Sequence, residues 1–313
     1  MDIEQVDVDL RTATLRLPAT DPSKTAMRRI SGIALKVMPV KRAPGVRVRT
    51  VRDGAARVRL YEPAERRTDA ALLWIHGGGL VIGDPRMDER LMSETAATLG
   101  LLVVSVYYRL APEHPFPAAH DDAHAAWTWL QANAASLGVD PARVVVGGES
   151  AGGGLAAGLV QRLHDEGAHP LGQWLFCPML DDRTAADRSL DAVGHFIWDN
   201  TANRFGWASY LGEEPGATEA PAYAVPARRE ELAGLPPAWI CVSDIELFHD
   251  EDADYARHLE TAGVPVTLDL VARAPHGFES WATDTPPARA LIARAHTWLA
   301  DRVGVSAPTP SRK

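Results

Sequence analysis

The feature that most constrains the fold of this 313-residue chain is a series of short apolar runs, rich in β-branched residues, with helical patterns between the later ones. The first two runs alternate between apolar and polar residues, as half-exposed antiparallel edge strands do, whereas later runs are solidly apolar, as strands buried on both faces are. Strands that alternate with helices predict an α/β fold, a mostly parallel eight-stranded sheet with helices on both faces. The predicted strands lie at residues 45–51, 57–62, 71–75, 102–107, 143–147, 173–177, 238–243 and 265–271, and the predicted helices near residues 86–99, 117–135, 151–166, 250–262 and 287–302.

Two stretches do not follow this alternation. Residues 1–40 are apolar but irregular, and residues 181–222 carry several aromatic side chains among Asp, Gly and Asn. Because the second stretch is inserted between two strands of the sheet, it cannot continue the strand–helix pattern. We therefore expect a single domain over residues 1–313, with a helical cap formed by these two stretches over the C-terminal edge of the sheet. The alternative is an ordinary helical excursion packed elsewhere.

The formal net charge of −9, with acids and bases interspersed, argues against several classes of partner. The chain lacks the basic stripe that nucleic acid or an anionic membrane would require. It also lacks a signal-peptide pattern and any run of 18 apolar residues, so we expect a cytoplasmic protein without stable membrane insertion. Cys177 and Cys241 are the only cysteines and lie in apolar runs. They are expected to be core residues rather than a disulfide or a metal pair.

A Gly-Glu-Ser-Ala-Gly turn at residues 148–152 follows a solidly apolar run and opens a helical pattern rich in Gly and Ala. This strand–turn–helix context is what the G-x-S-x-G nucleophile elbow requires, with Ser150 exposed above the edge of the sheet. By itself the pattern is short enough to arise by chance, and the alternative is a glycine-rich helix start that binds phosphate. No Lys-Ser or Lys-Thr pair follows, which excludes a P-loop.

Three successive glycines follow His76, directly after the apolar run at residues 71–75. They leave backbone N–H groups approachable, and an oxyanion hole needs such donors about 3 Å from the developing alkoxide. In lipases and esterases a loop of this kind follows the third strand, and this run is the third predicted strand. A plain turn would explain two glycines, but not three at the end of a strand that precedes a nucleophile elbow. Together the two motifs predict a serine nucleophile served by an oxyanion hole.

A carboxylate and a histidine should follow the serine in the chain, because this architecture orders its triad as Ser, acid, His. His276 lies in a loop just after the last predicted strand, whereas His258 and His296 fall inside helical patterns. We therefore predict His276 as the base. Three carboxylates compete for the role of the acid, and their position after the strand predicted at 238–243 leaves all three open: Asp244, Glu246 and Asp250.

With these residues identified, residues 70–300 resemble the bacterial hormone-sensitive-lipase family of α/β-hydrolases. The resemblance rests on His-Gly-Gly-Gly at 76–79, Tyr-Arg-Leu-Ala-Pro-Glu at 108–113 followed by His-Pro-Phe-Pro-Ala, Gly-Glu-Ser-Ala-Gly at 148–152, and Pro-His-Gly-Phe at 275–278. The chain departs from the family where Glu149 replaces the usual Asp before the serine. It departs again in the acid run, usually Asp-Pro-Leu-x-Asp-Glu, which here reads Glu-Leu-Phe-His-Asp-Glu at 246–251.

The resemblance implies roles for particular residues. Aligning the Asp-Glu pair at 250–251 with the family's run places the acid at Glu246, and both Asp and Glu are known in this role in the fold. The resemblance also implies a cap built from the N-terminal segment and from an insert after the sixth strand. It further implies an oxyanion hole formed by the amides of Gly78, Gly79 and Ala151.

The activity implied by the resemblance is hydrolysis of short- to medium-chain carboxylic esters through an acyl-enzyme on Ser150, without a metal or organic cofactor. The expected partner is a small-molecule ester, and family members often pair as homodimers. An interfacial lipase is disfavoured, because no amphipathic lid is obvious in the sequence. Two alternatives stay open. One is an amidase, deacetylase or acyltransferase with the same triad, and the other is a non-catalytic ligand-binding receptor, although the family's plant receptors lack the histidine present here as His276.

His120 and His124 stand at i and i+4 of a predicted helix, which superficially resembles a zinc site. The general-base glutamate of an H-E-x-x-H motif is missing, and the resemblance implies an acidic, Ala-rich helix here. We therefore expect no metal at this pair.

Overall fold

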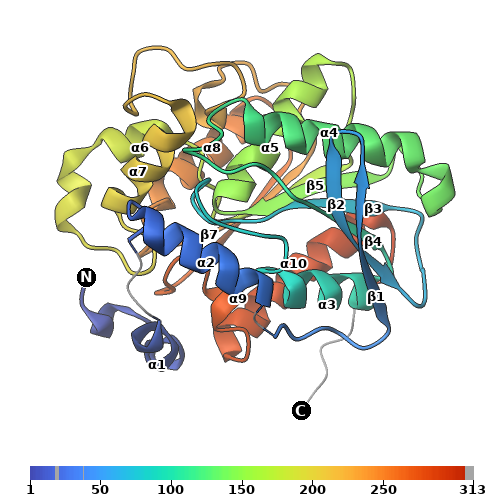
Figure 1. Cartoon of the computed structure of the whole chain (residues 1–313), viewed down its shortest axis with the longest axis horizontal. Coiled ribbons are helices and arrows are strands. Elements are labelled where there is room, and N and C mark those ends of the chain that lie inside the picture. Colours follow the sequence, from blue (N-terminus) through green and yellow to red (C-terminus); the bar gives the residue numbers. More distant parts are fainter. Residues whose placement is uncertain (18–20, 38, 307–313) are drawn as a thin grey trace.

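An eight-stranded sheet forms the centre of the molecule (Figure 1). The structure is a computed structural model that describes residues 1–17, 21–37 and 39–306. The strands are β1 (Val46–Asp53), β2 (Ala56–Pro63), β3 (Ala71–Ile75), β4 (Leu102–Val106), β5 (Val144–Glu149), β6 (Gly172–Phe176), β7 (Ala238–Ser243) and β8 (Val266–Val271). Their order is β1-β2-β4-β3-β5-β6-β7-β8. Only β2 runs antiparallel to its neighbours, and every other pairing in the sheet is parallel.

Helices cover both faces of the sheet, because successive strand residues point to opposite sides. Leu73 of β3 packs in the cluster that includes residues of α4 (Ala118–Asn133), α5 (Ala151–Asp165) and α8 (His249–Thr261). The next residue, Trp74, packs with α3 (Glu89–Leu99) and α10 (Pro286–Val303). The other helices are α1 (Val8–Arg16), α2 (Thr25–Val37), α6 (Asp182–Ala186), α7 (Asn200–Leu211) and α9 (Phe278–Trp281), with short 3-10 helices at Ile3–Gln5, Ala135–Leu137, Arg188–Ala192 and Pro226–Arg228.

The predicted α/β fold and its mostly parallel sheet are confirmed. Each of the eight predicted strands is present within two residues of its expected bounds. One detail of the prediction is wrong, because β2 is not a half-exposed edge strand. β2 lies between β1 and β4, and Arg59 and Tyr61 on one face of the strand are buried as well as Val58 and Leu60 on the other. β1 is the edge strand, and it keeps the half-exposed pattern.

Of the two stretches that break the strand–helix alternation, the first divides between two places, and the second lies beside part of it. α6 and α7, which we call the insert helices, lie together at the C-terminal ends of the strands, with α2 on the same side (Figure 1). The guanidinium of Arg28 on α2 lies 5.3 Å from the centre of the Phe205 ring on α7. In contrast, α1 packs against α10, and its Leu10 is fully buried there. Residues 1–17 and α2 therefore occupy separate positions on the sheet.

Aromatic rings fill the core beneath α3 and α10. Phe176 meets Trp174 and Trp239 edge to face, with ring centroids 4.7 and 4.8 Å apart, an arrangement that aromatic quadrupoles favour. Cys177 and Cys241 are buried free thiols, as the sequence predicted. Among the described residues, no helix combines the length and the apolar character needed to cross a bilayer.

Candidate active site

Ser150 occupies the sharp turn between β5 and α5. Its φ of 56° and ψ of −122° lie outside the regions that L-residues usually adopt, and its N–H donates to the Phe176 carbonyl at 2.8 Å. Two glycines make this turn possible. A Cβ on Gly148 would lie 2.2 Å from the Gly152 carbonyl oxygen, and a Cβ on Gly152 would lie 2.1 Å from that of Ile75. The turn thus has the strained geometry that a nucleophile elbow requires.

The structure brings Ser150, His276 and Glu246 into one hydrogen-bonded chain. The Ser150 hydroxyl donates to Nε2 of His276 at 2.8 Å, and Nδ1–H of His276 donates to Oε2 of Glu246 at 2.6 Å. The His276 ring also meets Phe248 edge to face, 5.2 Å between centroids, and the His276 carbonyl accepts the indole N–H of Trp281. All three members of the chain are buried, with 6–7% of their surface exposed. An imidazole held in this way can take the serine proton while the carboxylate fixes its tautomer.

The three carboxylates that compete as the acid point in different directions. Glu246 reaches the imidazole of His276. Oδ1 of Asp244 instead accepts the N–H of Arg273 at 2.6 Å, which ties the β7–α8 turn to the loop that carries His276. The side chain of Asp250 is 98% exposed at the start of α8. Of the three candidates, Glu246 is the one in contact with His276.

Ser243, the last residue of β7, shows how a glutamate fits this position. Its N–H donates to Oε1 of Glu246 at 3.1 Å, and its hydroxyl accepts the N–H of Ala274 at 3.0 Å. The Glu246 carboxylate therefore bridges a backbone amide at the end of β7 and the ring of His276. Sequence reasoning missed Ser243, because a serine that ends a strand carries no motif.

The glycine loop after β3 lies beside Ser150. A Cβ on Gly77 would lie 3.4 Å from Cβ of Ser150. Gly78 and Gly79 have φ values of 108° and 58°, in the region that favours glycine. Within the described residues, the amides of Gly78, Gly79 and Ala151 donate to no other protein group. Three N–H donors therefore stay available around the serine, which is what an oxyanion site needs.

Tyr108 and His76 hold the glycine loop. The Tyr108 hydroxyl lies 3.0 and 3.1 Å from the carbonyl oxygens of His76 and Gly77, to which it donates, and the two rings stack with centroids 4.3 Å apart. Nδ1–H of His76 donates to the Gly77 carbonyl at 2.8 Å. Burial lowers the pKa of His76 to about 4, so this imidazole is neutral and serves the loop as a hydrogen-bond donor. The sequence singled out the motif that begins at Tyr108 but not this role.

The insert packs directly on the glycine loop. A Cβ on Gly79 would lie 2.0 Å from the indole of Trp198, so the ring fills the space that any larger residue would need. On α7, a Cβ on Gly206 would lie 2.8 Å from the Gly79 carbonyl oxygen. The Trp198 indole N–H donates to Asn203 at 3.4 Å, which anchors the ring to α7. Trp198 is therefore an insert side chain that borders the available amides.

Buried carboxyl groups lie behind the loop of His276. Glu149, which precedes the nucleophile, accepts a hydrogen bond from the hydroxyl of Ser280. Burial raises the pKa of Glu149 well above its ordinary range, and it raises the pKa of Glu279 in the same way. The charge of Glu246 raises both pKa values further. The raised pKa favours the neutral form of Glu149, and its hydrogen bond with Ser280 ties the loop of His276 to the end of β5.

In the described part of the chain, one group of potential metal ligands comes together: donor atoms of Cys177, Glu246 and His276 lie within 4.8 Å of one another. The hydrogen bond between His276 and Glu246 already joins two of these ligands. Burial also raises the pKa of the Cys177 thiol well above its ordinary value, whereas a metal binds the thiolate. The arrangement therefore suits the His276–Glu246 pair better than a metal ion.

The i, i+4 histidine pair on α4 has separate partners. The His120 ring stacks on Tyr223 with centroids 5.8 Å apart, and burial lowers its pKa to about 4. Nε2 of His124 pairs with Glu166 at 2.8 Å. The two imidazoles thus have different neighbours, and Nε2 of His120 is buried without a hydrogen-bond partner among the described residues.

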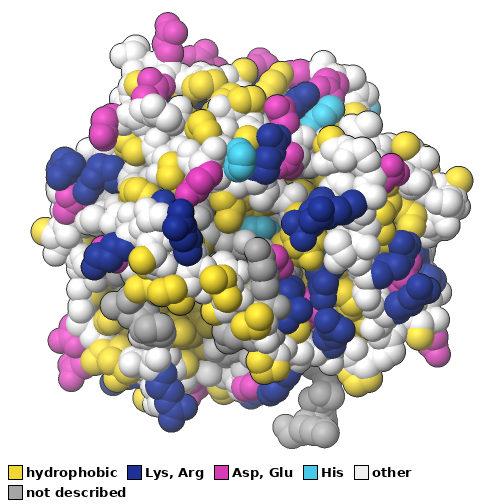
Figure 2. Space-filling model, viewed as in Figure 1, with side chains coloured by type: hydrophobic (Ala, Val, Ile, Leu, Met, Phe, Trp, Pro, Cys, Tyr) yellow, Lys and Arg dark blue, Asp and Glu magenta, His cyan; other side chains and the backbone are white. Residues whose placement is uncertain are grey.

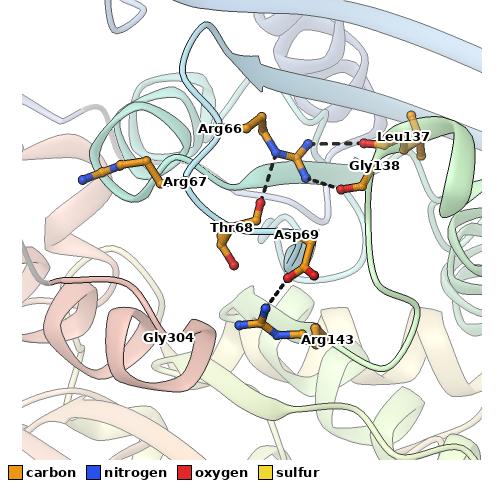
Figure 3. Close-up of a pocket in the computed structure, with 8 residues that line it drawn as sticks. All are labelled: Arg66, Arg67, Thr68, Asp69, Leu137, Gly138, Arg143 and Gly304. Atoms are coloured by element: carbon orange, nitrogen blue, oxygen red, sulfur yellow. Dashed lines mark hydrogen bonds and ion pairs between the residues drawn. The ribbon is translucent and has the colours of Figure 1, made fainter.

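A depression of about 570 Å³ lies where β3 and β5 begin, at the end of these strands opposite to Ser150 (Figure 3). Three arginines line it, and protein oxygen atoms engage each of them. Arg66 donates to two backbone carbonyls of the α4–β5 connection, Arg67 donates to a carbonyl of α3, and Arg143 pairs with Asp69. The arrangement of a nucleophile, a base and free amides is found instead around Ser150.

A nucleophile elbow between a strand and a helix of a mostly parallel sheet, followed in the chain by an acid and a histidine, defines the class of α/β-hydrolases. A family model described as the alpha/beta hydrolase fold matches residues 72–280. The chain therefore belongs to this family, in the hormone-sensitive-lipase-like branch that its motifs resemble.

Known relatives and solved structures agree with this assignment. Esterase LipI of Mycobacterium tuberculosis is 36% identical over 242 residues, which cover 75% of this chain and 74% of LipI. The ethyl acetate hydrolase of Pseudomonas putida is 36% identical over 238 residues, 73% of either chain. Among solved structures, a bacterial heroin esterase has a TM-score of 0.86 at 34% identity and covers 96% of this chain and 99% of its own. Esterase LipW of Mycobacterium marinum has a TM-score of 0.82 at 36% identity and covers 96% of both chains.

Proposed function

We propose that this protein is a serine carboxylesterase in which Ser150 is the nucleophile, His276 the general base and Glu246 the carboxylate that orients the base. The observation that carries the proposal is the unbroken chain of two hydrogen bonds, 2.8 and 2.6 Å long, that joins the three side chains. The relatives and structural neighbours named esterases support ester hydrolysis as the reaction.

In the first half of the reaction, Oγ of Ser150 attacks the acyl carbonyl carbon of the ester, and Nε2 of His276 takes the hydroxyl proton. The negative charge of Glu246 stabilises the imidazolium that forms. The carbonyl oxygen becomes an oxyanion, and we assign its stabilisation to the amides of Gly78, Gly79 and Ala151. Losing one donor of this kind costs about 3 kcal/mol of transition-state stabilisation.

The tetrahedral intermediate then collapses to an acyl-enzyme. The bond from the acyl carbon to the alcohol oxygen breaks, and the imidazolium of His276 returns its proton to the leaving alkoxide. In the second half, His276 takes a proton from a water molecule that attacks the acyl carbon. The bond to Oγ of Ser150 breaks, Ser150 recovers the proton, and the carboxylic acid is released.

The proposed substrates are short- to medium-chain esters. Trp198 packs on Gly79 and thereby limits the space beside the proposed oxyanion site. The name of the Pseudomonas relative, ethyl acetate hydrolase, supports a short acyl group. We also propose that α2 and the insert helices together form the cap. A homodimer and a cytoplasmic location stay predictions.

The proposal is tested by hydrolysis of p-nitrophenyl acetate, butyrate, octanoate and palmitate. Wild type should turn over the shorter esters, and Ser150→Ala should lose activity to the level of buffer. Ser136→Ala, which removes an exposed hydroxyl at the end of α4, is the matched control and should behave as wild type. No turnover by wild type would favour the receptor alternative, activity in Ser150→Ala would exclude this nucleophile, and a maximum at palmitate would overturn the proposed chain length.

A further inference from the structure

The helix α2 presents an apolar face to solvent. Ile30, Ile33 and Val37 lie at i, i+3 and i+7, on one side of the helix, and they are 63, 63 and 72% exposed. These are large fractions for such residues, and a clustered apolar surface of this kind marks a contact site. No amphipathic lid is obvious in the sequence, whereas the structure shows that α2 presents an apolar stripe to solvent.

The opposite face of α2 holds the helix on the protein. Arg28, whose side chain is 9% exposed, lies over the ring of Phe205 on α7 and pairs with Glu113 at 3.7 Å. Nε of Arg86, beyond β3, donates to the Leu35 carbonyl at 2.9 Å. A surface helix normally turns its charges outward and its isoleucines inward. Here an arginine faces inward and two isoleucines face outward, so the outward face lacks a partner within the described chain.

The stretch of chain that contains this helix is basic in sequence. Residues 24–60 contain 11 Lys and Arg and a single Asp, but five of these arginines pair with Glu62, Glu89 or Glu113, and those from Arg47 onward lie on β1 and β2. The expectation of interspersed charges is therefore wrong for this segment. On α2 itself, Arg29 is exposed next to Ile30 and forms no ion pair with the described residues. Figure 2 shows apolar side chains gathered over α2, with Lys and Arg side chains on both sides of them.

We propose that α2 is an interfacial helix through which this protein docks on the surface of an anionic phospholipid bilayer. An exposed apolar stripe flanked by basic residues is the pattern by which amphipathic helices enter the boundary between headgroups and acyl chains. Anionic lipids also attract basic segments close to the surface. The charge complementarity thus identifies the occupant, and the docking is peripheral.

A second copy of the chain fits this face less well. The three exposed apolar side chains supply little of the about 800 Å² per partner that a stable dimer buries. A lipid surface needs no matching contour.

Docking through α2 also has a consequence for access to the site. α2 rests on Phe205, and the next residue, Gly206, contacts the glycine loop. The edge of the sheet that carries Ser150 would therefore face the lipid.

The test measures binding to vesicles and does not depend on ester hydrolysis. Ser150→Ala protein is sedimented with phosphatidylcholine vesicles that contain about 30 mol% phosphatidylglycerol. It should bind these at least about tenfold more tightly than vesicles of phosphatidylcholine alone, and about 0.5 M NaCl should weaken the binding. When Ile30→Ser and Ile33→Ser are introduced together into the Ser150→Ala protein, binding to the anionic vesicles should weaken at least about tenfold. Arg29→Gln, introduced into the same protein, should weaken this binding about fivefold.

Leu270→Ser is the matched control, because Leu270 is 57% exposed on β8, at the other edge of the sheet from β1. It should bind as the parent does, and thermal unfolding should show each variant folded. Absence of binding to anionic vesicles, or an equal loss in Leu270→Ser, would overturn the proposal. Light scattering tests the other occupant. If the parent is a dimer and the variant with Ile30→Ser and Ile33→Ser is a monomer, a second copy covers α2 and the proposal of lipid docking is overturned.

Discussion

Replacing Glu246 by Gln should abolish most of the esterase activity, because it changes which nitrogen of His276 carries the proton. In the wild type, Nδ1–H donates to Oε2 of Glu246 at 2.6 Å, which leaves Nε2 free to accept the Ser150 proton. A glutamine can present its NH₂ group to Nδ1, which then favours the tautomer with the proton on Nε2. In that tautomer the ring cannot accept the serine proton.

The structure also sets the size of the effect. The side chain of Glu246 is 2% exposed, so water cannot replace the lost carboxylate, and the imidazolium would form without a counter-charge. A wrong tautomer of this kind costs about 10⁴-fold in kcat, which corresponds to about 5 kcal/mol. KM should change little, since the lost interaction strengthens only in the transition state. Glu246→Asp withdraws the carboxylate by about one C–C bond, ~1.5 Å. The 2.6 Å contact would then exceed hydrogen-bond length, so kcat should also fall.

Asp244→Asn is the matched control, because it makes the same carboxyl-to-amide change two residues earlier. Its Oδ1 can still accept the N–H of Arg273, so kcat should stay within about threefold of wild type. The assay is steady-state hydrolysis of p-nitrophenyl butyrate, with thermal unfolding to show that each variant is folded. If Asp244→Asn lost activity while Glu246→Gln kept more than a tenth of it, the assignment of the acid would be wrong.

Three further predictions concern the glycine loop, the insert and a buried carboxyl. Gly79→Ala should lower kcat at least about 10²-fold, because its Cβ would lie 2.0 Å from the Trp198 ring and displace an oxyanion donor. A kcat near that of wild type would exclude the Gly79 amide as an oxyanion donor. Trp198→Ala should shift the preferred p-nitrophenyl ester toward longer acyl chains, and an unchanged chain-length profile would show that the ring does not limit the pocket. Burial raises the pKa of Glu251 from 4.5 to about 8, because it disfavours the charged carboxylate. The stability that the protonated Glu251 side chain contributes is therefore complete below pH 4.5 and is lost as the pH rises through 8. Glu251→Gln should therefore gain stability over wild type in urea unfolding between pH 5 and 8, by up to about 1.4 kcal/mol per pH unit, and a gain independent of pH would contradict the reasoning.

Much of the fold could be predicted from the sequence, because the signals involved are local. Solidly apolar, β-branched runs are typical of strands covered on both faces and alternating runs are typical of half-exposed strands, and all eight predicted strands are present. The elbow was also readable, since the turn around Ser150 tolerates only glycine at 148 and 152, where a Cβ would meet a carbonyl oxygen at 2.1–2.2 Å. The order of the chain then made His276 the candidate base.

The tertiary structure decided what depends on side-chain direction and on distant neighbours. Asp244 and Glu246 are two residues apart in one turn, yet one side chain accepts the amide of Arg273 and the other reaches His276. Composition could not show that α2 buries Arg28 and exposes Ile30, because periodicity finds an amphipathic face but not the direction in which it points.

The sequence alone therefore determined the glycine-flanked turn on which the prediction of Ser150 as nucleophile rests, because close backbone packing dictates the glycines on either side of it. It did not determine the orientation of His276, because Glu246 and His276 are 30 residues apart on separate loops that meet only at the end of the folded sheet.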